Sequence, residues 1–208
     1  MSTLTVGAGC GYSTSAAAVA ASQDGDVVQV KAGTYVNDFA IINTSITLEA
    51  VGGRVNMVAT EPPKNLKGML TIGTTSSSPD VTITGFSCSG VRIPKNDGND
   101  GAGIRYQSGN LTLSDCQFSN NQDGLLATPL TLGTGSISID SSVFNHNGAG
   151  DGYSHNIYVG QVANFAITNS LIEDARAGHE IKSRALNSLI PASERQATAS
   201  TFRMAAMD

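Results

Sequence analysis

The sequence has no tryptophan, and aromatic and charged residues make up only 5% and 14% of its 208 positions. Glycine, serine, threonine and asparagine are abundant instead. This composition favours short strands joined by tight corners and argues against a helical bundle. A hydrophobic content of 40% allows a buried core and argues against disorder. The formal net charge of −5 opposes generic nucleic-acid binding.

Cysteine is also scarce, and the three residues Cys10, Cys88 and Cys116 have no metal-ligand spacing. We interpret all three as small apolar residues. The first residues lack a basic start and a continuous apolar run, so no signal peptide is expected in this chain. The localisation is left open: the protein is cytosolic, or it is extracellular or periplasmic if a leader has been removed. No segment is long enough to cross a bilayer, so no membrane association is expected.

One sequence motif, which we call the repeated phrase, recurs along the chain at variable spacing. The copies are VTITGFSC from Val81, LTLSDCQF from Leu111, SISIDSSVF from Ser136, FAITNSLI from Phe165 and ALNSLI from Ala185. Each alternates apolar and small polar residues, turns at a small or polar residue (Gly85, Asp115, Ser141, Asn169, Asn187), and returns to an apolar side chain. A recurring strand-and-corner unit predicts a solenoid, because one unit cannot bury its apolar side chains alone.

The phrases place equivalent side chains in inward columns that stack from coil to coil. The first column is expected to hold Ile83, Leu113, Ile139 and Ile167. The second is expected to hold Cys88, Phe118, Phe144, Ile172 and Ile190.

The N-terminal segment adds a second signal. An alanine-rich stretch that opens with hydroxyl residues predicts a helix at about 13–22, and a turn, a buried strand at Val27–Val30 and a turn at Gly33 follow. This order, GYSTSAAAVAASQDGDVVQVKAGTYV, resembles the first coil of the pectate-lyase-like superfamily of right-handed parallel β-helix proteins. The resemblance implies an all-β, right-handed parallel β-helix of about seven coils with an N-terminal helical cap. It implies little about activity, since that superfamily includes lyases, hydrolases, epimerases and phage tail fibres.

We therefore expect one β-helix domain over residues 1–190, followed by a tail over 191–208. The tail is either a helix that caps the last coil or a poorly ordered end. If the cap is poor, two chains are expected to pair as a homo-oligomer through the C-terminal end of the solenoid.

Four further strands, AGIRYQ, DGLLAT, HNIYVG and HEIKSR, can be laid over one another with Ile104, Leu125, Ile157 and Ile181 pointing inward. Adjacent coils lie about 4.8 Å apart, so the outward residues should form one patch. The expected patch contains Asn156, Tyr158, Glu180, Lys182 and Arg184. Arg105 is an outward residue of the first of these strands, and His155 and His179 are expected to stack at the strand entrances.

The patch has the residue types of an acidic-polysaccharide lyase or epimerase. Such a reaction needs a cation beside the substrate carboxylate and a base that loses its proton near neutral pH. We assign catalysis to Lys182 as base, Arg184 or Arg105 as carboxylate clamp, and Tyr158 or His155 as proton donor. Substrate binding is assigned to Arg105, Asn156, His179 and Glu180.

Polysaccharide lyases with this fold resemble this scheme and often hold calcium. No column of carboxylates lies beside Lys182, so no metal ligand and no cofactor is assigned, and Ca²⁺ remains an open alternative. The expected partner is an acidic polysaccharide.

One other interpretation of the patch remains. A strand with alternating Glu, Lys and Arg is often only a solvated surface with weak ion pairs. The protein would then be a non-catalytic solenoid that binds a glycan or serves as a scaffold or oligomerising module.

The enzyme hypothesis predicts that Lys182 and Arg184 line a groove between two long loops, here called excursions, Val91–Ala102 and Gly148–Ser154. Two asparagines, Asn121 and Asn147, are expected to bond along the stack at matching corners.

Overall fold

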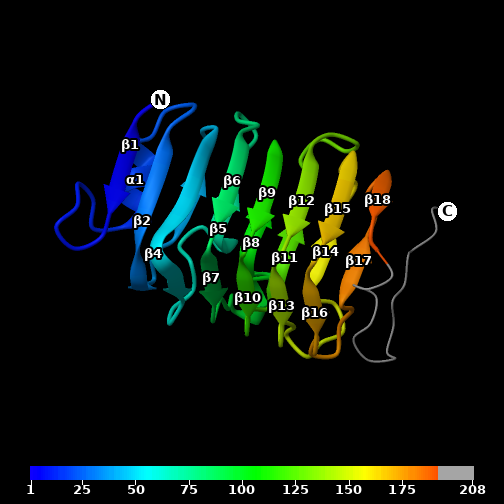
Figure 1. Ribbon diagram of the computed structural model, residues 1–208. Coiled ribbons are helices and arrows are strands. Elements are labelled where there is room, and N and C mark those ends of the chain that lie inside the picture. The colour runs from blue at the N-terminus through cyan, green and yellow to red at the C-terminus, as the bar shows by residue number, and fades with distance from the viewer. Residues whose placement is uncertain (192–208) are drawn as a thin grey trace.

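A computed structural model describes residues 1–191, and it shows a right-handed parallel β-helix (Figure 1). The larger sheet has twelve strands: β1 (Thr3–Val6), β2 (Val27–Val36), β4 (Ile46–Val58), β6 (Asp80–Thr84), β7 (Phe86–Ser89), β9 (Asn110–Ser114), β10 (Gln117–Ser119), β12 (Ser136–Asp140), β13 (Val143–Asn145), β15 (Asn164–Thr168), β16 (Leu171–Glu173) and β18 (Asn187–Leu189). The second sheet has six: β3 (Ala40–Ile42), β5 (Gly68–Ile72), β8 (Ala102–Tyr106), β11 (Asp123–Ala127), β14 (Ile157–Val159) and β17 (Ile181–Ser183).

Neighbouring coils pair in parallel and in register, as the repeated phrase predicts. Ile83 pairs with Leu113, Leu113 with Ile139, and Ile139 with Ile167, and all four side chains are fully buried. In the second column Phe118 lies between Cys88 and Phe144, with its ring centroid 4.7 Å from that of Phe144. Both inward columns are therefore confirmed except at Ile190. Asn187 is a strand residue that pairs with Asn164, so Ile190 continues the first column after Ile167 instead of the second.

Within each coil, the corner between its two strands in the larger sheet adopts the left-handed backbone conformation that short polar residues and glycine tolerate. The predicted turn residues Gly85, Asp115, Ser141 and Asn169 have φ of 78°, 49°, 49° and 52°. β4 is one continuous strand that bends at Gly52 and Gly53, where φ is 78° and 132°.

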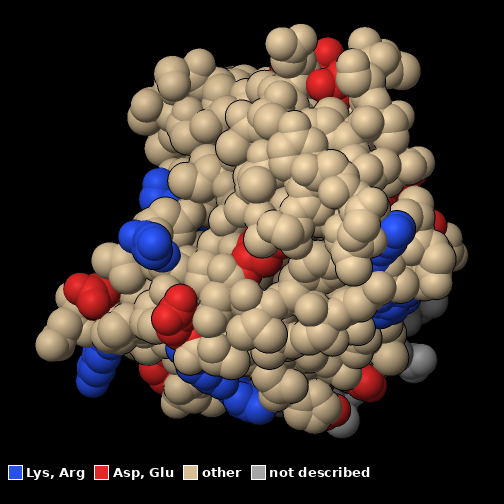
Figure 2. Space-filling model, turned by 90° about the vertical axis from the view of Figure 1, so that its left-hand side faces the viewer, with Lys and Arg blue, Asp and Glu red and all other residues tan. Residues whose placement is uncertain are grey.

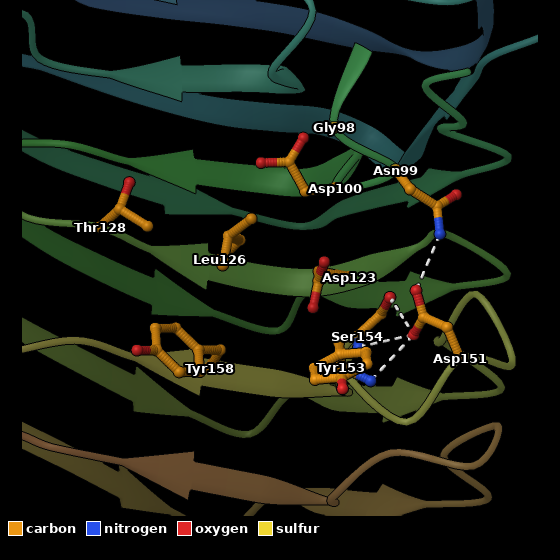
Figure 3. Close-up of a pocket in the computed structure, with 10 residues that line it drawn as sticks. All are labelled: Gly98, Asn99, Asp100, Asp123, Leu126, Thr128, Asp151, Tyr153, Ser154 and Tyr158. Atoms are coloured by element: carbon orange, nitrogen blue, oxygen red, sulfur yellow. Dashed lines mark hydrogen bonds between the residues drawn. The ribbon is translucent and has the colours of Figure 1, made fainter. Parts of the chain in front are cut away.

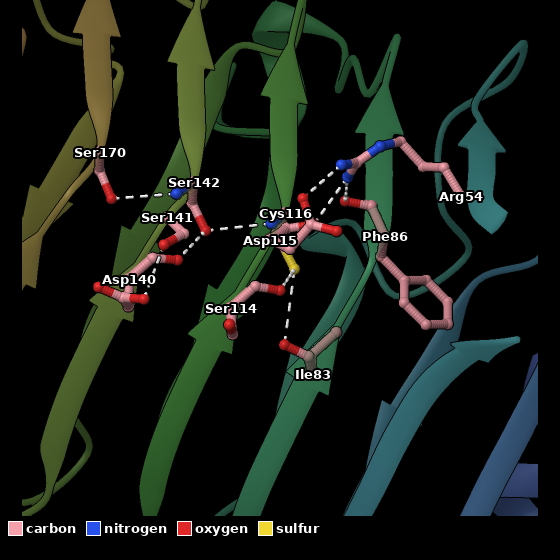
Figure 4. Close-up of polar contacts among 10 residues, drawn as sticks. All are labelled: Arg54, Ile83, Phe86, Ser114, Asp115, Cys116, Asp140, Ser141, Ser142 and Ser170. Carbon is pink, nitrogen blue, oxygen red and sulfur yellow. Dashed lines mark hydrogen bonds and ion pairs between the residues drawn. The ribbon is translucent and has the colours of Figure 1, made fainter.

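A ladder of small polar side chains satisfies the backbone next to these corners (Figure 4). The backbone N–H of Cys116 donates to Oγ of Ser142 at 3.1 Å, and that of Ser142 donates to Oγ of Ser170 at 3.1 Å. The Sγ atom of Cys116 bonds the carbonyl oxygen two residues earlier at 3.3 Å, as the hydroxyls of Ser142 and Ser170 do at 2.8 Å. Cys116 thus takes the place of a serine in the ladder, and burial raises the pKa of its thiol to about 11.

Helix α1 (Ser15–Ala21) covers the N-terminal end of the core, and its own Ala18 and Val19 are buried as part of that core. Its N-cap is Thr14, whose hydroxyl accepts from the backbone N–H of Ala17 at 3.2 Å. The carboxylate of Asp38 accepts from two further N–H groups of the first turn. Seen from this end, most of the surface is uncharged, and its charged side chains gather mainly in the lower half (Figure 2).

The single-domain division at residue 190 stays a prediction. The predicted C-terminal capping helix, and the pairing of chains that depends on it, concern a tail of which residues 192–208 lie outside the described part of the chain. A short 3₁₀-helix, η1 (Lys95–Asp97), lies in the excursion between β7 and β8.

Candidate functional site

The outer face of the six-stranded sheet carries one row of side chains in register. Adjacent strands pair Thr71 with Arg105, Arg105 with Leu126, Leu126 with Tyr158, and Tyr158 with Lys182. Because paired residues on adjacent parallel strands lie about 4.8 Å apart, each of these five side chains lies next to the equivalent side chain on the following coil. The structure thus places Arg105, Tyr158 and Lys182 in one row, with Leu126 between Arg105 and Tyr158. Nζ of Lys182 is 5.6 Å from the centroid of the Tyr158 ring.

A cavity of about 290 Å³ opens on this face (Figure 3). Its walls are the two excursions that the sequence indicated, through Gly98, Asn99 and Asp100 on one side and Asp151, Tyr153 and Ser154 on the other. Its remaining lining side chains are Asp123, Leu126, Thr128 and Tyr158. Lys182 and Arg184 do not line it, so the predicted groove exists between the predicted loops but holds carboxylates where cations were expected.

Asp123 is the most perturbed group in the cavity. Its residue is only 3% exposed, and Oδ1 accepts from the backbone N–H of His155 at 2.8 Å. Burial raises the pKa of its carboxyl to about 7, the neighbouring carboxylates Asp100 and Asp151 add to the rise, and the hydrogen bond from His155 opposes it. Asp123 therefore exchanges its proton near neutral pH. Sequence reasoning missed it; the available signal was a lone carboxylate directly before the buried segment GLLA.

The cavity walls are held by hydrogen bonds between segments distant in sequence. Nδ2 of Asn99 donates to Oδ2 of Asp151 at 2.8 Å, which joins the two excursions (Figure 3). Oδ1 of Asp151 accepts from the backbone of Tyr153 at 2.9 Å and from that of Ser154 at 3.1 Å. Asp151 is thus engaged in shaping its own loop.

Gln122 anchors the first excursion from inside. Its buried Oε1 accepts from the backbone N–H groups of Ile93 and Gly101 at 2.7 and 2.8 Å. Its Nε2 donates to the carbonyl of Ile93 at 3.0 Å and to Oδ1 of Asn99 at 2.6 Å. One side chain therefore fixes both ends of the loop that carries Asp100.

Arg105 lies at the edge of the cavity and points along its wall. One guanidinium nitrogen is 2.9 Å from Oδ2 of Asp100, and Nε donates to the hydroxyl of Thr128 at 3.1 Å. The side chain is 14% exposed, so this ion pair is partly shielded from water. Arg105 can therefore present only part of its guanidinium to a ligand.

His155 does not lie on the exposed face, as its assignment as proton donor assumed. It is 1% exposed, and its ring is stacked on Tyr158 at 5.9 Å and lies edge-on to His179 at 4.9 Å. Nδ1 accepts from the backbone N–H of His179 at 3.0 Å. Burial lowers the pKa of His155 to about 4, and the nearby charges of Lys182 and His179 contribute, so the ring is neutral at pH 7.

The expectation that Asn156 faces outward is wrong. It is 0% exposed and belongs to an internal amide ladder at the corner, in which Asn147 Nδ2 donates to Asn156 Oδ1 at 2.7 Å. Asn156 Nδ2 in turn donates to the carboxylate of Glu180, whose other oxygen accepts from the backbone of Ala175 at 3.0 Å. Corner backbone groups need buried partners, and this demand turns both side chains away from the sheet face.

The same ladder confirms the predicted contact between Asn121 and Asn147. Nδ2 of Asn121 donates to Oδ1 of Asn147 at 3.1 Å. The Asn121 amide also donates to the carbonyl oxygen of Cys88, and the Asn147 amide to that of Phe118. Gly124 is required beside them, because a Cβ there would lie 2.4 Å from a backbone oxygen and 2.9 Å from the Asn147 amide.

The remaining predicted residues lie at the C-terminal side of the face. Lys182 is half-buried, Arg184 is exposed, and His179 is half-buried beside His155. Within residues 1–191, no group of three or more His, Cys, Asp or Glu side chains is arranged to hold a metal ion. In the same residues no helix has the length and apolar character needed to cross a membrane.

No protein-family model matches the sequence, and no curated protein matches it. Among solved structures, the family PL6 alginate lyase AlyGC is similar over 90% of this chain, at 15% identity and a TM-score of 0.59. The chain has the fold of the pectate-lyase-like β-helices. It spans only 29% of the length of that lyase, and such low identity shows the fold alone.

Two further structures are similar with TM-scores below 0.5. Pectate lyase Pel9A has a TM-score of 0.43 at 14% identity, with 80% of this chain and 61% of that chain covered. The pectin methylesterase from Aspergillus niger has a TM-score of 0.39 at 14% identity, with 99% and 91% covered. Function must therefore be argued from the site itself.

Proposed function

We propose that the protein binds an acidic polysaccharide on the outer face of the six-stranded sheet and acts on it by proton transfer centred on Asp123. The observation that carries this proposal is a nearly buried carboxyl with a pKa of about 7 in a cavity that opens on the row containing Arg105, Tyr158 and Lys182. A general acid or base works best when its pKa lies near the working pH, and perturbed groups in clefts are candidates for that role.

The charges around the cavity support a substrate that is both hydroxylated and anionic. Asp100, Asp123 and Asp151 offer acceptors for sugar hydroxyls, and the ring of Tyr158 offers an apolar face. Lys182 and Arg184 have no carboxylate within ion-pair distance in the described part of the chain. These two cations are therefore free to neutralise substrate carboxylates along the row.

The chemistry that fits these groups is removal of the proton next to a uronate carboxylate. Ionised Asp123 accepts that proton, and Arg105, whose charge acts on Asp123 and which is ion-paired to the cavity residue Asp100, stabilises the negative charge that develops on the carboxylate. For elimination, the electron pair forms a carbon–carbon double bond as the glycosidic C–O bond breaks, and Tyr158 gives its hydroxyl proton to the leaving oxygen. For epimerisation, Tyr158 gives its hydroxyl proton to the opposite face of the same carbon, and no bond of the chain breaks. In this proposal Asp123 takes the role of base that the sequence suggested for Lys182.

The test is incubation of the protein with a panel of uronate polymers in deuterated buffer at pH 7. Proton abstraction is read as deuterium incorporation, and elimination as the ultraviolet absorbance of the unsaturated product. Replacement Asp123→Asn should lower the rate by about 10²- to 10⁴-fold. The matched control is Asp97→Asn on the exposed helix η1, which should leave the rate unchanged.

The assignment would be refuted if Lys182→Gln lowered the rate by the factor expected for Asp123→Asn while Asp123→Asn itself kept full activity. The role of base would then return to Lys182. No deuterium uptake on any polymer, combined with measurable binding, would leave a glycan-binding module without catalysis. No binding to any polymer would refute the proposed function altogether.

A further inference from the structure

The outer row of the six-stranded sheet is blocked on its N-terminal side. Thr71 stands in the row next to Arg105, yet it is only 1% exposed, because residues 63–67, which we call the strap, lie over it. Nδ2 of Asn65 donates to the Thr71 hydroxyl at 2.9 Å. Nζ of Lys67 donates at 2.8 Å to Oε1 of Gln107, the residue directly after the next strand, β8. The strap is thus fastened to two adjacent coils.

A second barrier stands directly beside the strap. The Arg105–Asp100 ion pair lies on the next strand, between the strap and the cavity. The Asn99–Asp151 hydrogen bond closes the side on which the two excursions meet (Figure 3). The cavity is therefore walled on two sides by contacts that the fold itself supplies.

The open part of the row is short. It consists of Tyr158 and Lys182, one step between adjacent strands or about 4.8 Å apart, because Leu126 is only 9% exposed and belongs to the cavity lining. Between β14 and β17 the described residues include no segment that covers the row as the strap covers Thr71, and Tyr158 and Lys182 are each partly exposed. A sugar chain lying on the row can thus extend past Lys182 but not past Arg105.

We infer that the cavity receives the terminal unit of the polysaccharide, and that the protein recognises a chain end instead of the middle of a chain. This inference rests on the proposed function, because it assumes that a saccharide occupies the face. A terminal unit carries a hydroxyl that an internal unit lacks, and the carboxylates of Asp100 and Asp123 are acceptors for it at the closed end of the row.

The experiment measures calorimetric binding of a uronate hexasaccharide and of two derivatives to the full chain. One derivative is reduced at the reducing end, and the other is O-methylated on the terminal hydroxyl of the non-reducing end. A blind cavity predicts that one modification weakens binding about tenfold or more while the other has no effect. Six units exceed the open row, so the second end lies outside the cavity in either orientation.

Equal affinity for all three hexasaccharides would show a groove that chains pass through and would overturn the inference while leaving the proposed function intact. Equal weakening by both modifications would overturn it as well. Absence of binding by all three would overturn the proposed function and this inference together.

A double variant of the strap gives a second readout. Asn65→Ala combined with Lys67→Ala releases the strap, and it should reduce the discrimination between the modified and unmodified ends. The matched control is Asn164→Ala on the opposite sheet, whose amide bonds an exposed serine. Unchanged discrimination in a folded strap variant would count against the strap as the barrier.

Discussion

Asp123 and His155 are neighbours, and burial shifts the pKa values of both side chains. The two shifts have opposite effects on how the free energy of unfolding depends on pH. The Asp123 carboxyl keeps its proton up to about pH 7 in the folded protein, whereas its ordinary value is 3.8. The His155 ring stays neutral down to about pH 4, whereas its ordinary value is 6.5. Between pH 4 and 6.5 the folded protein therefore holds a neutral carboxyl next to a neutral imidazole.

The two groups have opposite effects on the free energy of unfolding. For Asp123, the unfolded chain has lost a proton that the folded protein retains, so stability falls as pH rises from 4 to 7, by about 4 kcal/mol in total. For His155, the unfolded chain binds a proton that the folded protein rejects, so stability rises from pH 4 to 6.5, by about 3 kcal/mol. In the wild type these two contributions nearly cancel.

Single substitutions should separate them. In Asp123→Asn the free energy of unfolding, relative to wild type, should rise by about 4 kcal/mol between pH 4 and 7. In His155→Gln it should fall by about 3 kcal/mol, relative to wild type, between pH 4 and 6.5. Urea unfolding at half-unit pH steps measures both difference curves, and Asp97→Asn supplies the flat reference. A flat difference curve for Asp123→Asn would show that its carboxyl is not shielded from water and would refute the reasoning.

Two further predictions concern parts of the fold that support the site. Ser142→Ala removes the acceptor for the buried N–H of Cys116 and should cost about 1–3 kcal/mol of stability in urea unfolding, whereas Cys116→Ser should be nearly neutral; equal stability of Ser142→Ala and wild type would contradict the ladder. Gln122→Leu should speed hydrogen exchange at Ile93 and Gly101 while exchange at the Ile139 amide of the core stays slow, and unchanged exchange at both loop positions would show that Gln122 does not anchor the excursion. The exposed Gln161→Leu is the matched control.

Much of the architecture could be predicted from the sequence because it depends on local periodicity. Alternation along a strand decides which side chains point inward, so the register of Ile83, Leu113 and Ile139 follows from aligning one phrase with the next. The corners follow for a similar reason, since Asp115 and Ser141 occupy a backbone region that few residue types tolerate.

The candidate site could be predicted only in part. The row of Arg105, Tyr158 and Lys182 depends on the same alternation and was found. Asn156 was placed wrongly, because the amide ladder that pulls it inward is formed by side chains from different coils. Alternation within one strand contains no information about that demand.

What the sequence determined by itself is therefore the repeat: which residues stack, where the chain turns, and that parallel coils share one core. The tertiary structure decided what happens above the sheet face, where excursions of irregular length meet. Burial of Asp123 depends on two loops joined by Asn99 and Asp151, and closure of the row depends on a strap fastened at Thr71. A proton affinity and a blocked path are properties of packed surroundings, so they exist only once distant segments have come together.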